Sequence, residues 1–326
     1  MTRKPVLIIS IDCECDKSSD WTSSNPLTFD SITDGIPNRL QPVFDQFRAI
    51  PTYLLSNEVL EDQKSVKTLK ALTGKFELGA HLHSDYIRPK QVYHNYAGTL
   101  TLKYQCEFPK NIEKQKMLNL TELFKNAFGY SPSSFRAGRF GAGKNTIRIL
   151  ESLDYKVDSS VHPGLKITTQ NEEINYTKTP IFPYFTDIDD LTAKGKSTVL
   201  EVPVTLYRHP VLQRFFPFIN IINRETFIEK ALCKIFPSTV LRPTYHTAAE
   251  MIRASRKLIH KSNSSPVFLN MMFHSMEIIP GASPYAKNPE QANRIVHRIK
   301  DYLQWWDKSG YSYSSLGDTI TYFNRT

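Results

Sequence analysis

Three acidic side chains follow the first apolar run of the chain. Residues 6–11 are apolar except for one serine, and Asp12, Glu14 and Asp16 come directly after them. Alternate side chains of an extended chain point to the same side, so the three carboxylates share one face. Like charges held together repel one another unless a cation or a proton lies among them. The pattern therefore predicts a cation site. The alternative, an acidic surface loop, is disfavoured directly after a buried strand.

Two histidines at alternate positions form a second cluster. His81 and His83 lie in the string GAHLHSD, so their imidazoles also share one side. Neutral imidazoles bind zinc, nickel, cobalt or iron. With carboxylates from another strand end they would supply the mixed nitrogen and oxygen ligands of a catalytic metal site, which leaves one position open to water. The alternative is one metal ligand and one structural histidine.

Two further polar clusters lie later in the chain. Residues 134–143 read SFRAGRFGAG, and the guanidinium groups of Arg136 and Arg139 can bind carboxylates or anionic substrate groups. This string lacks the pattern of a phosphate-binding loop, so we exclude nucleotide binding. His274 ends a strongly apolar run, and Glu277 follows it. A histidine in this place is a candidate general acid, although an isolated one is more often a core residue.

These clusters need structural elements that bring them together. Apolar runs and helical patterns alternate along most of the chain. They predict strands at 6–12, 51–55, 76–81, 134–136, 156–159, 199–204 and 267–273, and helices at 36–48, 57–72, 111–128, 144–153, 248–260 and 289–306. This alternation is typical of parallel strands with crossover helices, in an open sheet or a barrel. Because the carboxyl ends of such strands gather active-site groups, we expect the four clusters to meet.

The segment 163–245 is less regular and contains many prolines. We interpret it as an insertion within a single catalytic domain that spans residues 1–326. The stretch 211–237 places apolar side chains among basic ones: Phe215, Phe216, Phe218, Ile219, Ile221, Ile222 and Phe227. The prolines interrupt any long amphipathic helix, so they favour a buried insertion or a dimer contact over a peripheral membrane contact.

The composition limits the classes of protein that fit. The chain has 326 residues, 40% of them hydrophobic, and a formal net charge of +9. This charge favours acidic partners such as anionic glycans or phosphate-bearing lipids, whereas no recognition motif supports nucleic acid as a partner. No apolar stretch is long enough to span a membrane, and residues 6–11 are too short for a signal peptide. Four cysteines do not suggest a disulfide framework. We expect a reduced, cytoplasmic setting.

The four clusters, in this order, resemble the polysaccharide deacetylases of the NodB-homology class, carbohydrate esterase family 4. The strings GAHLHSD and FRAGRFGAG resemble the branch found with lipopolysaccharide and capsule biosynthesis genes. The resemblance implies an α/β fold, a distorted (β/α)7 barrel. It also implies a divalent metal, in first place Zn²⁺ with Ni²⁺, Co²⁺ or Fe²⁺ as alternatives, bound by one acidic residue and two histidines.

The resemblance also implies roles for individual residues. Asp12 matches the general base, Arg136 the arginine that orients it, and His274 the catalytic histidine. His81 matches the first metal histidine, and Asp158 the acidic residue of a fourth motif. We expect Arg139, Asp158 and Glu277 to bind substrate.

The chain departs from the family pattern in two places. The adjacent pair of aspartates is spread here over Asp12, Glu14 and Asp16, so either Glu14 or Asp16 is the acidic metal ligand. Cys13 follows Asp12 directly and is a less favoured thiolate ligand. The position of the second histidine holds Asp85, and we expect His83 to replace it.

These features predict a metal-dependent deacetylase that removes N-acetyl groups from a sugar of a surface polysaccharide or lipopolysaccharide. A lipid-linked sugar substrate would place the protein at the inner face of the membrane. A loop with Tyr86, Tyr93, Tyr96 and Tyr104 suits sugar stacking or loop packing. Two alternatives stay open: a catalytically silent glycan-binding homologue, and a metal-dependent hydrolase of a small amide. The oligomeric state also stays open.

Overall fold

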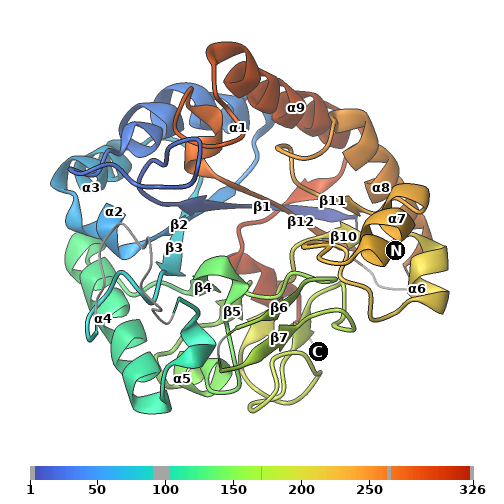
Figure 1. Cartoon of the computed structure of the whole chain (residues 1–326). Helices are drawn as coiled ribbons and strands as arrows, with labels where there is room; N and C mark the ends of the chain where they lie inside the picture. Colours follow the sequence, from blue (N-terminus) through green and yellow to red (C-terminus); the bar gives the residue numbers. More distant parts are fainter. Residues whose placement is uncertain (1–3, 91–102, 170, 263–265, 324–326) are drawn as a thin grey trace.

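A computed structural model describes residues 4–90, 103–169, 171–262 and 266–323. Figure 1 shows helices arranged around a curled central sheet. In the described residues seven parallel strands form this sheet, in the order β12 (Phe268–His274), β1 (Val6–Cys13), β2 (Pro51–Leu55), β3 (Glu77–Leu82), β4 (Ser134–Ala137), β5 (Val157–Asp158) and β9 (Leu200–Glu201). The predicted distorted (β/α)7 barrel is confirmed. Two short strands extend the sheet: β8 (Tyr184–Phe185), antiparallel to β9, and β13 (Ser312–Tyr313), beside β1.

The barrel has a seam between β9 and β12. No strand pairing joins these two strands in the part of the chain that the structure describes. Hydrogen bonds of Asn270 bridge the gap instead. Its backbone amide donates to Thr205 Oγ1 (2.7 Å), its carbonyl accepts from the Thr205 amide (3.1 Å), and its side-chain amide donates to the Val202 carbonyl (3.3 Å). The side-chain oxygen of Asn270 accepts from Ser10 Oγ on β1 (2.7 Å).

The central strand β1 is buried along its whole length. One face packs into the main core beneath the helices, with Leu7, Ile9, Ile11 and Cys13. Val6 and Ile8 point to the other side, where a smaller cluster fills the lower part of the barrel. Because side chains alternate, Ser10 and Asp12 lie on this interior side as well. β1 therefore directs the side chain of Asp12 into the interior of the barrel and the side chain of Cys13 into the main core.

The outer helices follow the predicted pattern with local differences. Three helices have nearly the predicted bounds: α4 (Lys110–Phe128), α8 (Ala248–Lys261) and α9 (Pro289–Lys308). A shorter helix, α5 (Thr146–Ser152), lies within the predicted range 144–153. Gly129 ends α4 at a positive φ of 84°, a conformation that glycine adopts without strain.

Two predicted helices are each divided in the structure. The range 36–48 holds the end of a π-helical segment, η1 (Ser31–Leu40), followed by α1 (Gln41–Phe47). The range 57–72 holds α2 (Asn57–Glu61) and α3 (Gln63–Ala71), because Asp62 has an extended backbone and accepts a hydrogen bond from the Ser65 amide (2.7 Å). Such a side-chain cap starts a new helix.

The segment that we interpreted as an irregular insertion contributes to the barrel. It contains β8 and β9, two small ladders, β6 (Lys166–Thr168) with β7 (Glu173–Asn175) and β10 (Leu206–Tyr207) with β11 (Thr239–Val240), and the helices α6 (Pro210–Phe215) and α7 (Phe227–Ile235). Leu212 of α6 and Cys233 of α7 pack on a small core with β10 and β11. The apolar stretch is buried only in part, and the prediction of a buried insertion or a dimer contact stays a prediction. Ile219 and Ile221 are buried, whereas Phe215, Phe218 and Phe227 are exposed.

None of the described helices is both long and apolar enough to cross a membrane.

Candidate active site

An ion pair inside the barrel joins Asp12, at the end of β1, to Arg136 on β4. Arg136 donates to Asp12 Oδ1 (2.7 Å), to the hydroxyls of Ser10 (2.6 Å) and Ser159 (2.8 Å), and to the Ser159 carbonyl (2.8 Å). Burial raises the pKa of Asp12, but the charges of Arg136 and two neighbouring histidines outweigh it, so the pKa lies below its usual value. Asp12 is therefore a carboxylate anion with one oxygen held by Arg136.

Glu14, His81 and His83 form a buried cluster beside this pair, and their ligand atoms all lie within 4.8 Å of one another. His81 belongs to β3, while Glu14 and His83 follow the ends of β1 and β3 directly. Glu14 Oε1 is 3.4 Å from His81 Nε2 and 3.1 Å from His83 Nε2. Burial raises the pKa of Glu14, but His83, His81 and Lys17 outweigh it and hold the pKa well below its usual value.

This cluster fits a divalent metal. The Nδ1 atom of His81 lies 3.1 Å from the Arg136 carbonyl, which fixes the proton there and leaves a lone pair on Nε2. His81 Nε2 and both ring nitrogens of His83 are buried without a hydrogen-bond partner in the described structure. Buried polar atoms ordinarily have partners. Two imidazole nitrogens and one carboxylate that converge in this way are a ligand set for zinc or a similar ion.

Asp16, the other expected acidic ligand, does not join the cluster. Its two carboxylate oxygens accept hydrogen bonds from the backbone amides of Asp30 (2.6 Å) and Ser31 (3.1 Å), at the start of η1. Asp85, at the position of the usual second histidine, is also engaged elsewhere, because Arg139 donates two hydrogen bonds to its carboxylate (2.9 and 3.0 Å). Cys13 points into the main core. The structure therefore brings Glu14, and neither Asp16 nor Cys13, to the histidines.

His274 faces Asp12 from β12, and the two residues are register partners in the sheet. Its Nε2 atom lies 3.9 Å from Asp12 Oδ2 and 3.7 Å from Glu14 Oε1. Its Nδ1 atom lies 2.9 Å from Glu277 Oε1. Glu277 is fully buried and is not among the described residues that line the pocket, and its role in binding substrate stays a prediction. It orients His274, and Arg242 in turn donates to Glu277.

Asp158 is likewise buried away from the pocket. Its side chain has no exposed surface, accepts a hydrogen bond from Ser160 Oγ (2.5 Å) and interacts with the carboxyl group of Glu201. Burial raises the pKa of Asp158 to about 6. Asp158 is not among the described residues that line the pocket, and its role in binding substrate stays a prediction.

The candidate site opens into a pocket of about 270 Å³. Its described lining comprises Asp12, Glu14, Lys17, Trp21, His83, Tyr86, Ala137, Arg139, Phe140, Arg242, Met272, His274 and Tyr285. Five of the sequence-predicted residues thus meet at its wall: Asp12, Glu14, His83, Arg139 and His274. Trp21, Phe140 and Tyr285 are aromatic side chains of the same wall that the sequence did not single out. Trp21 contacts the edges of His274 (5.7 Å between ring centroids) and Tyr285 (5.5 Å).

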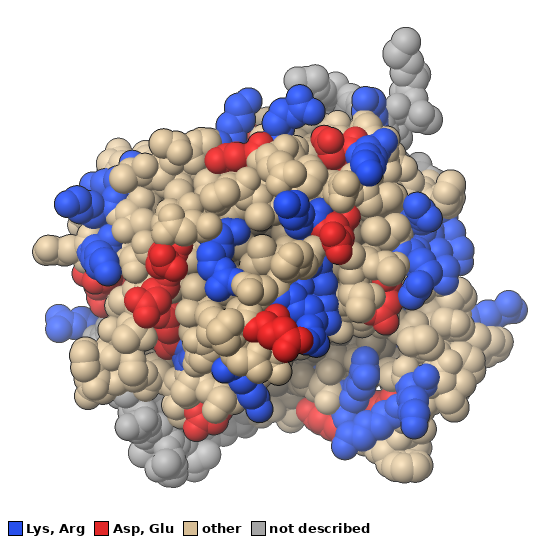
Figure 2. Space-filling view, turned by 90° about the horizontal axis from the view of Figure 1, so that it is seen from above, with Lys and Arg blue, Asp and Glu red and all other residues tan. Residues whose placement is uncertain are grey.

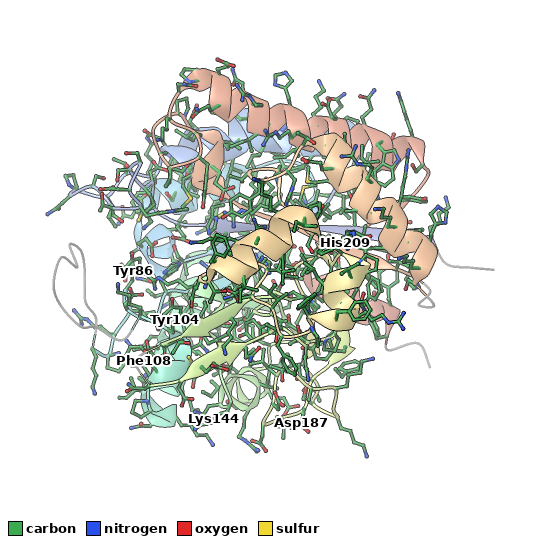
Figure 3. All side chains as sticks on the ribbon, turned by 45° about the vertical axis from the view of Figure 1, so that its right-hand side comes forward. Tyr86, Tyr104, Phe108, Lys144, Asp187 and His209 are labelled. Atoms are coloured by element: carbon green, nitrogen blue, oxygen red, sulfur yellow. The ribbon has the colours of Figure 1, made fainter. Side chains whose placement is uncertain are left out.

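The tyrosines of the loop after β3 divide between described and undescribed residues. Tyr86 stacks on His83 with ring centroids 5.2 Å apart, and Figure 3 places it on the same flank as Tyr104. Tyr93 and Tyr96 lie outside the described residues.

Lys17 and Arg242 line the pocket, but they were not predicted from the sequence. Arg242 lies two residues after β11, in a segment where the sequence pattern predicted no strand, so no local signal identified it.

Comparisons with known proteins show the fold. No family model matches the chain, and no curated protein matches it in sequence. A probable polysaccharide deacetylase from Pseudomonas aeruginosa PAO1 is similar in structure, with a TM-score of 0.54 at 11% identity over 98% of this chain and 90% of that one. Puue allantoinase gives 0.55 at 11% identity over the same shares. A GH57-type branching enzyme from Pyrococcus horikoshii gives 0.53 at 9% identity over 99% of this chain and 71% of that one.

The chain therefore has the barrel fold that polysaccharide deacetylases share. Because the names of these three structures describe different activities on one fold, the fold alone does not select a reaction. The residues at the strand ends must do so.

Proposed function

We propose that this protein is a metal-dependent deacetylase that hydrolyses the N-acetyl group of a sugar. The observation that carries the proposal is the convergence of three functions in one pocket. The cluster of Glu14, His81 and His83 suits a metal, Asp12 is a buried carboxylate, and His274 stands opposite it. A probable deacetylase with the same fold supports this reading.

The residues of the chain divide the proton transfers between them. Asp12 keeps Oδ2 free toward the pocket while Arg136 holds Oδ1, so it can take a proton from an attacking water molecule. His274 presents Nε2 to the same space and can give a proton to the leaving amine, with Glu277 fixing its ring through Nδ1. A divalent ion, Zn²⁺ in first place, would supply Lewis acidity and lower the pKa of a bound water toward about 7. The products are acetate and a free amino sugar.

The aromatic walls support a sugar as the substrate. Trp21 is 40% exposed, and its ring and that of Tyr86 line the pocket. An exposed aromatic ring such as that of Trp21 suits the apolar face of a sugar ring. Arg139 and Lys17 add positive charge at the same wall, which suits an anionic glycan. We therefore propose an N-acetylated surface polysaccharide or lipopolysaccharide unit as the substrate class.

Metal analysis and product analysis together test this function. Purified protein is expected to contain about one equivalent of a divalent metal by elemental analysis and to release acetate from N-acetylated glycans. The same assay on small linear and cyclic amides is the comparison. If the protein contains metal but hydrolyses only small amides, the substrate is a small amide and not a glycan. An intact fold with neither metal nor acetate release would support a silent glycan-binding homologue and contradict the proposal.

A further inference from the structure

An exposed apolar surface lies on the side of the molecule that carries α6 and α7. Nine large hydrophobic side chains are exposed in the described residues, and six of them fall within residues 215–235: Phe215, Phe216, Phe218, Phe227, Ile228 and Ile235. We call these six side chains the apolar patch. Phe227 is the most exposed, at 84%. Both helices pack on one small core and lie side by side in Figure 1. Grouped exposed apolar side chains mark an interaction surface.

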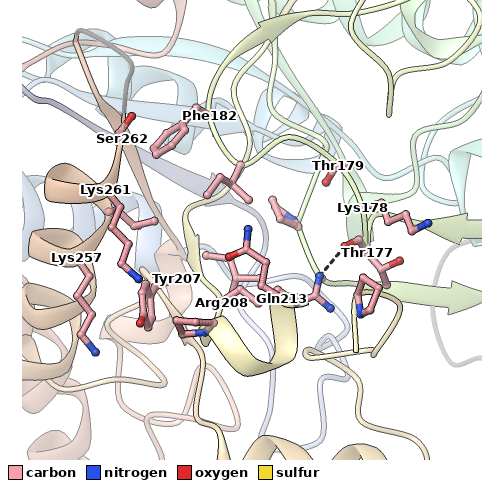
Figure 4. A pocket seen from close by; sticks show the side chains of 17 residues that line it. Thr177, Lys178, Thr179, Phe182, Tyr207, Arg208, Gln213, Lys257, Lys261 and Ser262 are labelled. Carbon is pink, nitrogen blue, oxygen red and sulfur yellow. Dashed lines mark hydrogen bonds between the residues drawn. The ribbon is translucent and has the colours of Figure 1, made fainter. Parts of the chain in front are cut away.

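A cavity with four cationic side chains adjoins this patch (Figure 4). It has a volume of about 560 Å³ and lies apart from the pocket of the candidate active site. Lys178, Arg208, Lys257 and Lys261 line it, and no Asp or Glu is among its described lining residues. None of the four forms an ion pair with a described carboxylate. We call it the basic pocket. Four cationic side chains without a carboxylate among the described lining residues suit an anionic ligand.

The apolar patch and the basic pocket form one surface. Pro210 and Gln213 of α6 line the pocket, and the same helix ends at Phe215. Lys178 Nζ lies 3.6 Å from the ring centroid of Phe218. Arg208 donates a hydrogen bond to the carbonyl of Phe216 (3.2 Å). A ligand seated on the patch therefore meets the cations of the pocket.

The charged side chains around the apolar patch indicate which kind of partner it binds. The stretch 214–235 carries four basic side chains, Arg214, Arg224, Lys230 and Lys234, and two acidic ones, Glu225 and Glu229. The carboxylate of Glu229 is engaged in capping α7, where it accepts from the Thr226 amide (2.9 Å). Basic and acidic side chains are mixed over the face shown in Figure 2. A twofold dimer through the patch would place the same surface against itself, and like charges would then face each other.

We propose that the apolar patch and the basic pocket dock this protein on an anionic phospholipid bilayer. The six apolar side chains enter the boundary between headgroups and acyl chains, and the cations of the pocket bind lipid phosphates. Such interfacial binding combines buried apolar area with attraction to anionic lipids. It needs no spanning helix, in keeping with the described helices. The inference is independent of the proposed deacetylation, because it rests on residues outside the active-site pocket.

Vesicle flotation with the full chain tests the docking. The protein is expected to float with vesicles of equal parts phosphatidylglycerol and phosphatidylcholine, and to stay unbound with phosphatidylcholine alone. Phe227→Ser combined with Ile228→Ser removes the two most exposed apolar side chains, and we expect at least about a ten-fold loss of binding. Lys178→Gln, Lys257→Gln and Lys261→Gln together are expected to lose on the order of a hundred-fold.

Matched controls keep this test specific. The triple change Lys64→Gln, Lys67→Gln and Lys70→Gln neutralises three exposed lysines of α3, on the other side of the barrel in Figure 1, and is expected to change binding little. Tyr130→Ser removes an exposed aromatic outside the patch. Equal binding of both lipid mixtures, or equal losses in control and patch variants, would overturn the proposal. So would a concentration-dependent dimer in sedimentation velocity that the Phe227 and Ile228 changes abolish, since it would assign the patch to a second copy.

Discussion

The Nε2 atom of His274 and the Oδ2 atom of Asp12 face each other at 3.9 Å across the paired strands β12 and β1. Each residue is anchored through its other polar atom. Arg136 holds Asp12 Oδ1 at 2.7 Å, and Glu277 holds His274 Nδ1 at 2.9 Å. The two inward atoms are therefore presented to the pocket in fixed positions, as an acid and a base that share one substrate require.

Replacing Asp12 by Asn tests its role as the base. Asn keeps the shape of the side chain but accepts a proton poorly, so kcat for acetate release is expected to fall by about 10²–10⁴-fold. The metal content should stay unchanged, because the ligand cluster consists of Glu14, His81 and His83. Elemental analysis and steady-state kinetics on the same preparation measure both. Full turnover by the variant would remove Asp12 as the base.

The acidic metal ligand can be identified by comparing Glu14→Gln with Asp16→Ala. The first change should abolish metal binding, as should His81→Ala and His83→Ala. The second should keep the metal and cost about 1 kcal/mol of stability, because Asp16 accepts hydrogen bonds from two amides at the start of η1. Metal titration and urea denaturation distinguish these results. Metal retained by His83→Ala, or lost only by Asp16→Ala, would contradict the assignment.

The buried pair of Arg242 and Glu277 should show strong coupling in a double-mutant cycle. Glu277→Gln leaves the guanidinium of Arg242 without its carboxylate in a buried place, which costs about 3–5 kcal/mol. Arg242→Met combined with Glu277→Gln should be less destabilised than the sum of the single variants. Denaturant unfolding measures the free energies. Additive effects would show that the pair contributes little to stability.

The carboxyl groups of Asp158 and Glu201 should make stability depend on pH. Burial raises the pKa of Asp158 from 3.8 to about 6 and raises that of Glu201 as well. The folded state therefore binds protons more tightly than the unfolded state, so this contribution is complete below pH 4 and is lost as the pH rises to about 6. The loss from Asp158 amounts to about 3 kcal/mol at most. Asp158→Asn should flatten this part of the stability curve. If the free energy of unfolding of the variant, measured in urea, fell between pH 4 and 6 as steeply as that of the unchanged protein, the assignment would be contradicted.

Local sequence patterns predicted the elements and the inward residues well. Alternation along β1 was enough to place Asp12 on the interior side, and alternation along β3 did the same for His81. Patterns of this kind depend only on backbone geometry. They could not separate Glu14 from Asp16, because the chain leaves the strand after Cys13 and the alternation ends there.

Contacts between side chains from distant segments could not be predicted from local sequence patterns. Glu277 was expected at the substrate, but its contact with His274 depends on Arg242, which comes from a segment without clear periodicity. The pairing of Asp85 with Arg139 likewise depends on the neighbouring ends of β3 and β4. Pairings of this type arise because the barrel brings the ends of different strands together, and they produce no local spacing pattern in the sequence.

The seam between β9 and β12 affects how firmly the edge of β12 is held in the barrel. The side-chain amide of Asn270 forms hydrogen bonds with Ser10, Ser159 and Val202 on both sides of the seam. Ser10 and Ser159 are also the two serines that accept hydrogen bonds from Arg136. The other edge of β12 is paired with β1 over seven residues, so loosening of Asn270 would weaken only the edge of β12 that faces the seam. His274 lies on that strand, and Asp12 lies on the strand beside it. The pairing of β12 with β1 sets the distance between Asp12 and His274, and the neutral side chain of Asn270 supports the strand that carries His274 from the seam side.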